Sequence, residues 1–238
     1  DPALAFGTAV PFGLSSRQTW SWLQVAGGRD ILREVYRDQN VHAIPTANTG
    51  AQMGGWFRRE IRTIDDMKGL KMRIAGIAGL VMTKLGVVAQ QLAPGDIYPA
   101  LERGVIDAAE YIGPYDDEKL GFNRIARFYY YPGWQEYAPS VDMMVNARLW
   151  DGLPAHYRHA MEAAGAETWH WSMARFDVLN PPALRRLIAG GAQLRPYTRA
   201  IMDATYRATQ DLYAELGEGN PRFRRVWEHW ERHRIEQT

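Results

Sequence analysis

Short apolar runs alternate with amphipathic stretches over the first 145 residues. The apolar runs end at glycine or at a charged residue and predict strands, whereas the stretches between them show the spacing of helices. Strands are predicted at residues 3–10, 41–45, 70–74, 87–91, 105–109, 128–131 and 141–145. Helices are predicted at residues 15–39, with an interruption at Gly27 and Gly28, and at residues 78–85 and 96–103. Strands that alternate with short helices are typical of an α/β fold with βαβ units.

The rest of the chain follows a mostly helical pattern. Pro154 stands at the start of a long helix that is expected to end before Pro181, because proline lacks the amide hydrogen that a helix interior needs. Further helices are predicted at residues 183–189, 199–216 and 221–235, with a strand at 193–197. The sequence therefore predicts an α/β first half and a helical second half.

Composition narrows the class of protein. The 238 residues are 46% hydrophobic, which is ample for one large or two small cores. The net charge of +1 gives no indication of a nucleic acid or an anionic membrane as partner, and the absence of cysteine excludes disulfides and thiolate metal sites. The chain contains no run of about 20 apolar residues, so no membrane-spanning helix is predicted. The chain opens on Asp1 within an apolar run, so a processed or truncated chain is expected.

Two acidic residues follow strand-like runs. Glu110 comes directly after the run at 105–109, and Glu136 follows the Pro132-Gly133 turn. Either residue alone is more often a surface carboxylate, because an unpaired buried charge costs several kcal/mol. As a pair at similar strand ends, they offer hard oxygen ligands for Na⁺ or Ca²⁺.

A basic residue and a glycine-rich segment complete the candidate site. Arg73 lies within the run at 70–74, where its planar guanidinium suits a carboxylate, although a solvated strand face is equally compatible. The segment NTGAQMGGWF at residues 48–57 supplies Asn48, Gln52 and glycines that let a backbone approach a ligand. An ordinary glycine-rich turn is the alternative. Together these residues indicate a charged small molecule held in a cleft.

Other polar clusters favour structural explanations. His229 and His233 are spaced as metal ligands on a helix, but their charged neighbours indicate a solvated face. Residues 116–118 are predicted to form the cap and first turn of a short helix rather than an acidic site. No G-x-S-x-G elbow, P-loop, HExxH motif or nucleophile–base pair occurs, so no enzyme is predicted.

Several segments in register resemble a known family. They are FGTAVPFGL at 6–14, NTGAQMGGWFRREI at 48–61, MKGLKMRI at 67–74, GDIYPALERGVIDAAE at 95–110, YYYPGWQE at 129–136 and NPPALRRLIAGGAQLRPY at 180–197. The chain resembles the extracytoplasmic, DctP-type solute-binding subunits of tripartite ATP-independent periplasmic (TRAP) transporters. It is most similar to the branch that binds 2-oxo acids and related monocarboxylates with a metal cation.

The resemblance implies a two-domain α/β periplasmic solute-binding fold, with a ligand cleft and a long domain-spanning helix. The first βαβ stretch of the family is expected to be absent, and the chain is expected to be short at both ends. Residues 1–30 would belong to the N-terminal α/β domain and residues 31–110 mostly to the second. Residues 111–145 would cross and return between the domains, and residues 146–238 would form the connecting and C-terminal helices.

The resemblance also implies roles for individual residues. Arg73 would bind the carboxylate of the ligand, with Asn48 as a further polar contact. The cation, Na⁺ or Ca²⁺, would be held by Gln52, Glu110, Tyr111 and Glu136. Of these four, Gln52, Tyr111 and Glu136 would also contact the ligand. The family usually has tryptophan where this chain has Tyr111, which a main-chain carbonyl ligand would tolerate.

The implied function is capture of a small carboxylate, such as pyruvate or a related hydroxy acid, in the periplasm and its delivery to TRAP membrane subunits. No organic cofactor and no nucleic acid are expected. A homodimer is possible, although the short C-terminus argues against it. One alternative is a metal-dependent enzyme acting on 2-oxo acids, against which stands the lack of a histidine or lysine beside the acid pair. The other is a truncated sensor or interaction module without a transport role.

Overall fold

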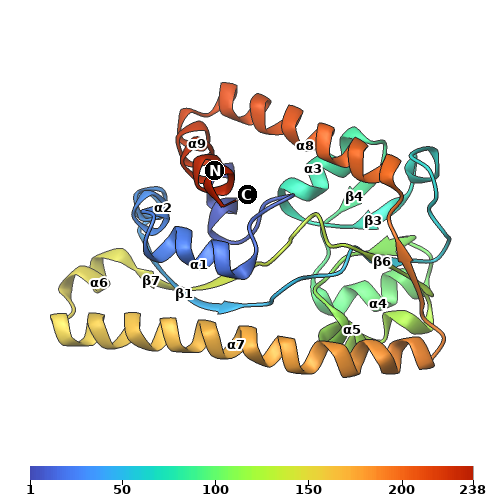
Figure 1. The fold of residues 1–238 in the computed structure, drawn as a ribbon, viewed down its shortest axis with the longest axis horizontal. Helices are drawn as coiled ribbons and strands as arrows, with labels where there is room; N and C mark the ends of the chain where they lie inside the picture. The colour runs from blue at the N-terminus through green and yellow to red at the C-terminus, as the bar shows by residue number, and fades with distance from the viewer. Residues whose placement is uncertain (238) are drawn as a thin grey trace.

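A computed structural model, which describes residues 1–237, arranges the chain as two lobes joined by one long helix (Figure 1). Helix α7 (Ala155–Ala189) runs along both lobes at the bottom of the view. One lobe holds a two-stranded antiparallel sheet, and the other holds a six-stranded mixed sheet in the order β4-β3-β5-β2-β6-β8. The sequence-based expectation of an α/β fold with a long spanning helix is met.

The first lobe combines helices with the small sheet. Its elements are a 3-10 helix at Pro2–Gly7, α1 (Ser16–Gln24), α2 (Gly28–Arg37), β1 (Val41–Asn48), β7 (Ser140–Asn146) and α6 (Ala147–Gly152). Ser15 and Gln18 form a reciprocal capping box at the start of α1. Gly27 separates the two helices with φ of +83°, a left-handed conformation that glycine adopts without steric cost.

The second lobe is built on the six-stranded sheet. Its strands are β2 (Gly55–Phe57), β3 (Lys71–Arg73), β4 (Val88–Gln90), β5 (Ala108–Ala109), β6 (Phe128–Tyr131) and β8 (Gln193–Pro196). Its helices are α3 (Gly76–Lys84), α4 (Pro94–Glu102) and α5 (Pro114–Leu120), with 3-10 turns at Asp65–Met67 and Phe122–Arg124. Strand β2 runs antiparallel to both β5 and β6, whereas β3 is parallel to β4 and β5.

Two C-terminal helices return the chain to the first lobe. Helix α8 (Arg199–Gly219) crosses the top of the view, and α9 (Pro221–Glu236) packs beside the N-terminal segment (Figure 1). Asp1 accepts hydrogen bonds from Asn220 and Arg222 at the start of α9. Phe6 anchors this junction, with ring centroids 5.3 Å from Phe223 and 5.6 Å from Trp230. Such aromatic burial is a large stabilising contribution to the first lobe.

Two local predictions are wrong. Residues 3–10 were expected to form a strand, but Pro2–Gly7 is a 3-10 helix, because Asp1 accepts a hydrogen bond from the amide of Ala3 and Pro2 suits a first turn. The long helix was expected to end at Asn180, yet α7 continues through Pro181 and Pro182 to Ala189.

Packing explains why α7 continues past the two prolines. Ala183 and Leu187 lie beyond them and are fully or nearly fully buried. Asn180 accepts a hydrogen bond from the amide of Tyr115 at the start of α5, and Arg186 forms an ion pair with Glu118 of α5. Tertiary contacts with α5 therefore outweigh the local cost of proline inside the helix.

Candidate functional site

The topology of the six-stranded sheet brings the predicted site residues to one end. Arg73 is the last residue of β3 and Glu110 follows β5, its parallel neighbour, so that the amide of Glu110 donates to the carbonyl of Arg73 at 3.0 Å. Strand β2 runs the opposite way, so the segment before it reaches the same end. There the carbonyl of Gln52 accepts from the amide of Gly133, in the segment that leads to Glu136.

Arg73 and Glu110 form a buried ion pair. Nη1 of Arg73 lies 3.3 Å from Oε2 of Glu110 and donates at 2.5 Å to the main-chain oxygen of the same residue. The two side chains are 14% and 2% exposed, respectively. In this low-dielectric setting the pair is held firmly, and removal of one partner would leave an uncompensated charge. Nε of Arg73 is buried and finds no hydrogen-bond partner within residues 1–237.

A second carboxylate competes for the same positive charge. Burial, followed by the negative charge of Glu136, raises the pKa of Glu110 well above its ordinary value, and Arg73 offsets this only in part. Burial likewise raises the pKa of Glu136 to about 7, against the opposing effect of Arg73. Two acids that share one arginine resist full ionisation together. A bound cation would supply the positive charge that the pair lacks.

Unpartnered acceptor atoms support a cation at this end of the sheet. Gln52 donates from Nε2 to Oγ1 of Thr49 at 3.2 Å, which turns its Oε1 away from that contact. Among the described residues, Oε1 of Gln52, Oε1 of Glu110 and Oε1 of Gln135 are all buried without a hydrogen-bond partner. Buried acceptors are normally satisfied, so three of them around one acid pair fit a hard cation that prefers oxygen ligands.

Tyr111 and Asn48 differ in how free they are to meet a ligand. The ring of Tyr111 is partly buried, lies 5.7 Å from Cζ of Arg73 and packs edge-on against Phe122. The side chain of Asn48 is fully buried and largely occupied. Its Oδ1 accepts from Ser16 and from the amide of Gly50, and its Nδ2 donates to the carbonyl of Ala138. One hydrogen of Nδ2 is all that this carboxamide has left to offer a ligand.

Two residues of this region were missed by sequence reasoning. Gln135, only 1% exposed, donates from Nε2 to the carbonyl of Met53 at 2.7 Å. Asp117, also 1% exposed, accepts from Nε1 of Trp56 at 2.9 Å and from the hydroxyl of Tyr129 at 2.7 Å. Asp117 lies in the first turn of α5, as the sequence predicts, but its side chain is buried and serves two aromatic residues. The signal that could have identified Asp117 is that Trp56 and Tyr129, two aromatic residues on predicted buried segments, each carry a polar group that needs a partner.

The histidine pair on α9 has other partners. Nδ1 of His229 accepts from Nε1 of Trp22 at 3.0 Å, and Nε2 of His233 lies 2.9 Å from the hydroxyl of Ser21. Within residues 1–237, no three histidine, aspartate or glutamate side chains are grouped so as to hold a metal. A cation at the Glu110–Glu136 pair would accordingly need amide or carbonyl oxygens as further ligands.

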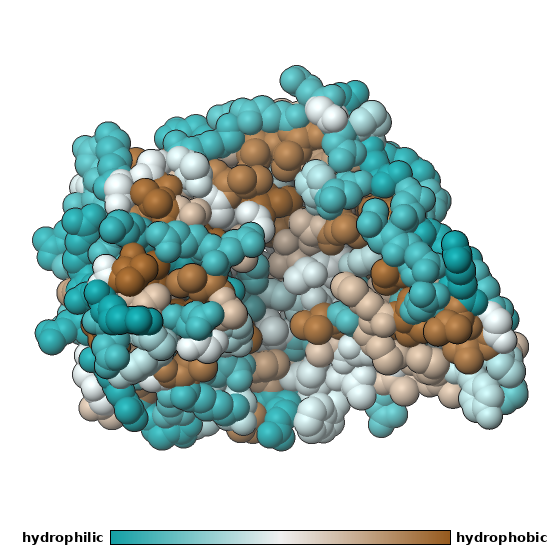
Figure 2. All heavy atoms as spheres, turned by 180° about the vertical axis from the view of Figure 1, so that it is seen from behind, coloured by the Kyte–Doolittle hydropathy of each residue, from teal (hydrophilic) through white to brown (hydrophobic). Residues whose placement is uncertain are grey.

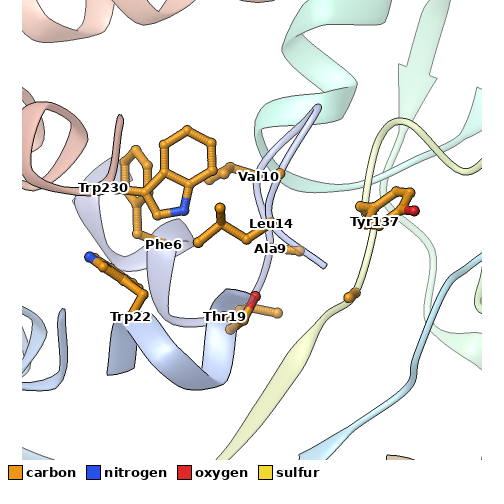
Figure 3. A pocket seen from close by; sticks show the side chains of 11 residues that line it. Phe6, Ala9, Val10, Leu14, Thr19, Trp22, Tyr137 and Trp230 are labelled. Atoms are coloured by element: carbon orange, nitrogen blue, oxygen red, sulfur yellow. The ribbon is translucent and has the colours of Figure 1, made fainter. Parts of the chain in front are cut away.

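A small void lies in the first lobe, apart from the candidate site. Figure 3 shows this void beside Phe6, Trp22 and Trp230, with Tyr137 on its far side. Its volume of about 20 Å³ suits roughly one water molecule and no organic acid. Figure 2, the view from behind, shows the surface hollowed between the two lobes.

Comparison with known proteins identifies the class of protein. A model of the bacterial extracellular solute-binding protein family 7, DctP, matches residues 1–220, and the chain belongs to this family. The two-domain periplasmic solute-binding fold expected from the sequence is confirmed. In the part of the chain that the structure describes, no helix is both long enough and apolar enough to cross a membrane.

Individual relatives define the neighbourhood more closely. The chain is 48% identical over 229 residues to a monocarboxylate 2-oxoacid-binding periplasmic protein of Nostoc sp., a match that covers 96% of this chain and 63% of the relative. It is 50% identical to a TRAP solute-binding protein from Bordetella bronchiseptica, whose structure holds calcium and picolinate. That match has a TM-score of 0.97 and covers 100% of this chain and 70% of the other.

A third relative, from Pseudoalteromonas atlantica, is 34% identical with a TM-score of 0.93 over 98% of this chain and 71% of the other, and it binds sodium and pyruvate. The chain thus spans less than two thirds of the length of the Nostoc relative.

Proposed function

We propose that this chain captures a small 2-oxo carboxylate, such as pyruvate, together with a bridging Na⁺ or Ca²⁺ ion. The observation that carries the proposal is the set of buried Glu110 with half-buried Arg73 and Glu136, beside buried acceptor oxygens that have no hydrogen-bond partner among the described residues. An arginine fork suits the ligand carboxylate, and two acids suit the cation. The 2-oxoacid name of the Nostoc relative and the sodium and pyruvate of the Pseudoalteromonas relative support this ligand class.

The proposed roles follow from what each group has free. Arg73 binds the ligand carboxylate through donors that its contact with Glu110 leaves unused. Gln52, Glu110, Glu136 and the main chain of Tyr111 hold the cation, and all but Glu110 also border the ligand. When bound, the cation neutralises the acid pair and attracts the keto oxygen of the ligand. Asn48 contributes mainly by fixing the segment that carries Gln52.

The site suggests how capture is coupled to the movement of the lobes. We propose that the ligand closes the cleft by a hinge motion, because a ligand that touches both lobes favours the closed state. The first crossing between lobes is proposed to fall between Asn48, at the end of β1, and Gly55, at the start of β2. In this scheme the closed receptor, located in the periplasm, delivers its ligand to the membrane subunits of a TRAP transporter. A homodimer, reported for the Bordetella relative, is a further proposal that sedimentation can test.

A thermal-shift screen of the 238-residue chain tests the proposed function. The panel holds pyruvate, longer 2-oxo acids, lactate and C4 dicarboxylates, each with Na⁺, with Ca²⁺ or with chelator and a cation-free buffer. Ligand at a hundredfold excess over Kd is expected to add about 2.7 kcal/mol of stability. The shift should require both cation and 2-oxo acid and should vanish on chelation. A shift that is independent of cation, or metal-dependent turnover of pyruvate, would contradict the proposal.

A further inference from the structure

The hydroxyl of Thr49 links the main chain of the turn after β1 to the side chain of Gln52. Its Oγ1 accepts from Nε2 of Gln52 at 3.2 Å and donates to the carbonyl of Gly50 at 3.1 Å. Thr49 is 8% exposed and Gln52 is 6% exposed. Bulk water therefore has little access to either side chain, so their polar atoms depend on partners within the fold.

The turn that carries Thr49 is itself held by hydrogen bonds. The amide of Thr49 donates to the carbonyl of Pro139 at 3.1 Å. Gly50 has φ of +67°, a left-handed conformation that glycine adopts without steric cost, and its amide donates to Oδ1 of Asn48 at 2.9 Å. The carbonyl of Gly50 is therefore held where the hydroxyl of Thr49 reaches it.

These contacts decide which end of the Gln52 carboxamide faces Thr49. A hydroxyl has one hydrogen to donate, whereas a carboxamide can present either its donor nitrogen or its acceptor oxygen. The hydrogen of Thr49 is used on the carbonyl of Gly50, so towards Gln52 the hydroxyl can only accept. The nitrogen of Gln52 must then face Thr49. Its Oε1 is left buried and without a hydrogen-bond partner among the described residues, which suits a hard cation.

We propose that Thr49 is a positioning residue for the cation site, a role that rests on the proposed function and extends it. Its hydroxyl, fixed by the carbonyl of Gly50, holds the carboxamide of Gln52 with the oxygen free for the ion. Outer hydrogen-bond partners orient metal ligands in this way in many proteins, and their loss commonly costs about ten- to a hundredfold in affinity. Thr49 itself contacts neither the cation nor the organic ligand in this scheme.

Calorimetric titration of Thr49→Val and Thr49→Ser tests the assignment. Valine keeps the branched shape of threonine but has no hydroxyl, so we expect the Kd for Ca²⁺ alone to rise about tenfold. Serine keeps the hydroxyl and should bring the Kd back towards that of the wild type. A purely structural role would instead lower the unfolding midpoint of Thr49→Val without raising the Kd of the folded protein for Ca²⁺.

A double variant shows whether Thr49 acts through Gln52. Gln52→Met removes the oxygen that Thr49 is proposed to orient, so adding Thr49→Val should not raise the Kd for Ca²⁺ any further. If Thr49→Val weakens Ca²⁺ by the same factor with and without the carboxamide of Gln52, the positioning role is overturned.

Thr209→Val serves as the matched control. Thr209 lies in α8, is fully buried, and donates from its hydroxyl to the carbonyl of Thr205 at 2.7 Å. Its replacement also removes a buried hydroxyl, but should leave the Kd for Ca²⁺ unchanged. A Thr209 variant that weakens Ca²⁺ as much as Thr49→Val would count against the assignment.

The remaining outcomes separate the two proposals. If the wild-type chain binds neither Ca²⁺ nor pyruvate, the proposed function itself fails. If the wild type binds both and Thr49→Val matches it, only the assignment of Thr49 fails. Should Thr49→Val not fold, a crystal structure of the wild type with Ca²⁺ decides. The assignment is wrong if Oε1 of Gln52 is not a ligand of the ion, or if Nε2 lies beyond hydrogen-bonding reach of Thr49.

Discussion

Glu110 and Asp117 are two buried carboxylates in one lobe whose surroundings differ in kind. Asp117 accepts three hydrogen bonds, from Trp56, Tyr129 and the amide of Ile112. Glu110 meets one arginine and a second acid, and one of its oxygens has no hydrogen-bond partner in residues 1–237. Burial raises the pKa of both residues, to about 6 for Asp117 and well above the ordinary value for Glu110.

Burial and a raised pKa therefore do not mark the ligand site by themselves. The distinguishing property is how much hydrogen-bonding capacity the folded chain leaves unused. Asp117 is satisfied by its neighbours and so is expected to contribute to stability. Glu110 is left with an unused oxygen and an acidic neighbour, which is expected where a ligand completes the structure.

The largest expected effect is the loss of ligand binding in Arg73→Met. The guanidinium is the only cation paired with the acids at this end of the described sheet, so we expect the Kd for pyruvate to rise at least about a hundredfold, the value of a charge-assisted bidentate pair. Calorimetric titration in saturating Ca²⁺ measures it. An unchanged Kd would remove Arg73 from the ligand site.

The Arg73→Met variant needs a control because it also leaves the buried carboxylate of Glu110 without its ion-pair partner. Loss of one partner from a buried ion pair costs about 3 to 5 kcal/mol, so weak binding could reflect partial unfolding. Arg73→Met/Glu110→Gln removes both charges and should recover part of that stability without recovering pyruvate binding. Recovery of binding in the double variant would show that Arg73 acts only by neutralising Glu110.

Asp117→Ala should have the opposite profile, with a large effect on stability and a small one on affinity. The indole of Trp56, the hydroxyl of Tyr129 and the amide of Ile112 would lose their acceptor, which we expect to lower the free energy of unfolding by about 3 kcal/mol. Chemical denaturation gives this value. At temperatures where the variant is folded, its pyruvate Kd should stay near that of the wild type. A selective loss of binding would place Asp117 in the ligand site.

A smaller effect is expected from Glu136→Gln, and its sign depends on pH. The pKa of Glu136 is about 7 in the folded chain against an ordinary 4.5, so the folded state binds the proton more tightly than the unfolded state. Stability is then highest below about pH 4.5 and falls as pH rises to about 7. In cation-free buffer at pH 8, Glu136→Gln should be more stable than wild type by about 2 kcal/mol.

Denaturation at several pH values, with and without Ca²⁺, separates this effect from others. Ca²⁺ should reverse the order of stability at pH 8, because it binds the wild type more tightly than the variant. Glu60, a half-buried acid paired with Arg62 and Arg195, offers a comparison, because its replacement should not change the response of stability to Ca²⁺. If the free energy of unfolding depends on pH in the same way in wild type and Glu136→Gln, ionisation of Glu136 does not destabilise the folded chain.

Sequence patterns predicted most of the second lobe because its elements are local. The strands at Arg73 and Tyr131 and the helices between them carry their own apolar spacing and glycine stops. The continuation of α7 through residues 180–182 and the 3-10 helix in place of a strand at residues 3–10 were not predictable in this way. Contacts with α5, which is distant in sequence, carry α7 through residues 180–182. Residues 3–10 take their form from the cap of Asp1 and from Pro2, which apolar spacing alone does not register.

The candidate site was predictable in its charges but not in its hydrogen bonds. Arg73, Glu110 and Glu136 stand at strand ends in the sequence, which indicated a charged ligand. Gln135 gave no comparable signal, since a neutral amide next to an acid is compatible with any surface. Only the fold shows that Gln135 is buried and donates to the carbonyl of Met53, in the segment before β2.

The smallest effect is expected at Tyr111, where this chain departs from the tryptophan of the similar family. If the cation uses the main chain at this position, Tyr111→Trp should change the Kd for Ca²⁺ by no more than about twofold, the range of substitutions that disturb no specific contact. The larger ring would still stack near Arg73 and meet Phe122. Tyr111→Ala, which removes both ring contacts, is the informative partner and should weaken pyruvate more than Ca²⁺. A tenfold loss of Ca²⁺ affinity in Tyr111→Trp would instead mean that the phenol oxygen is itself a cation ligand. Tyr111 would then belong, with Glu110, to the groups whose hydrogen-bonding capacity is left for the ligand.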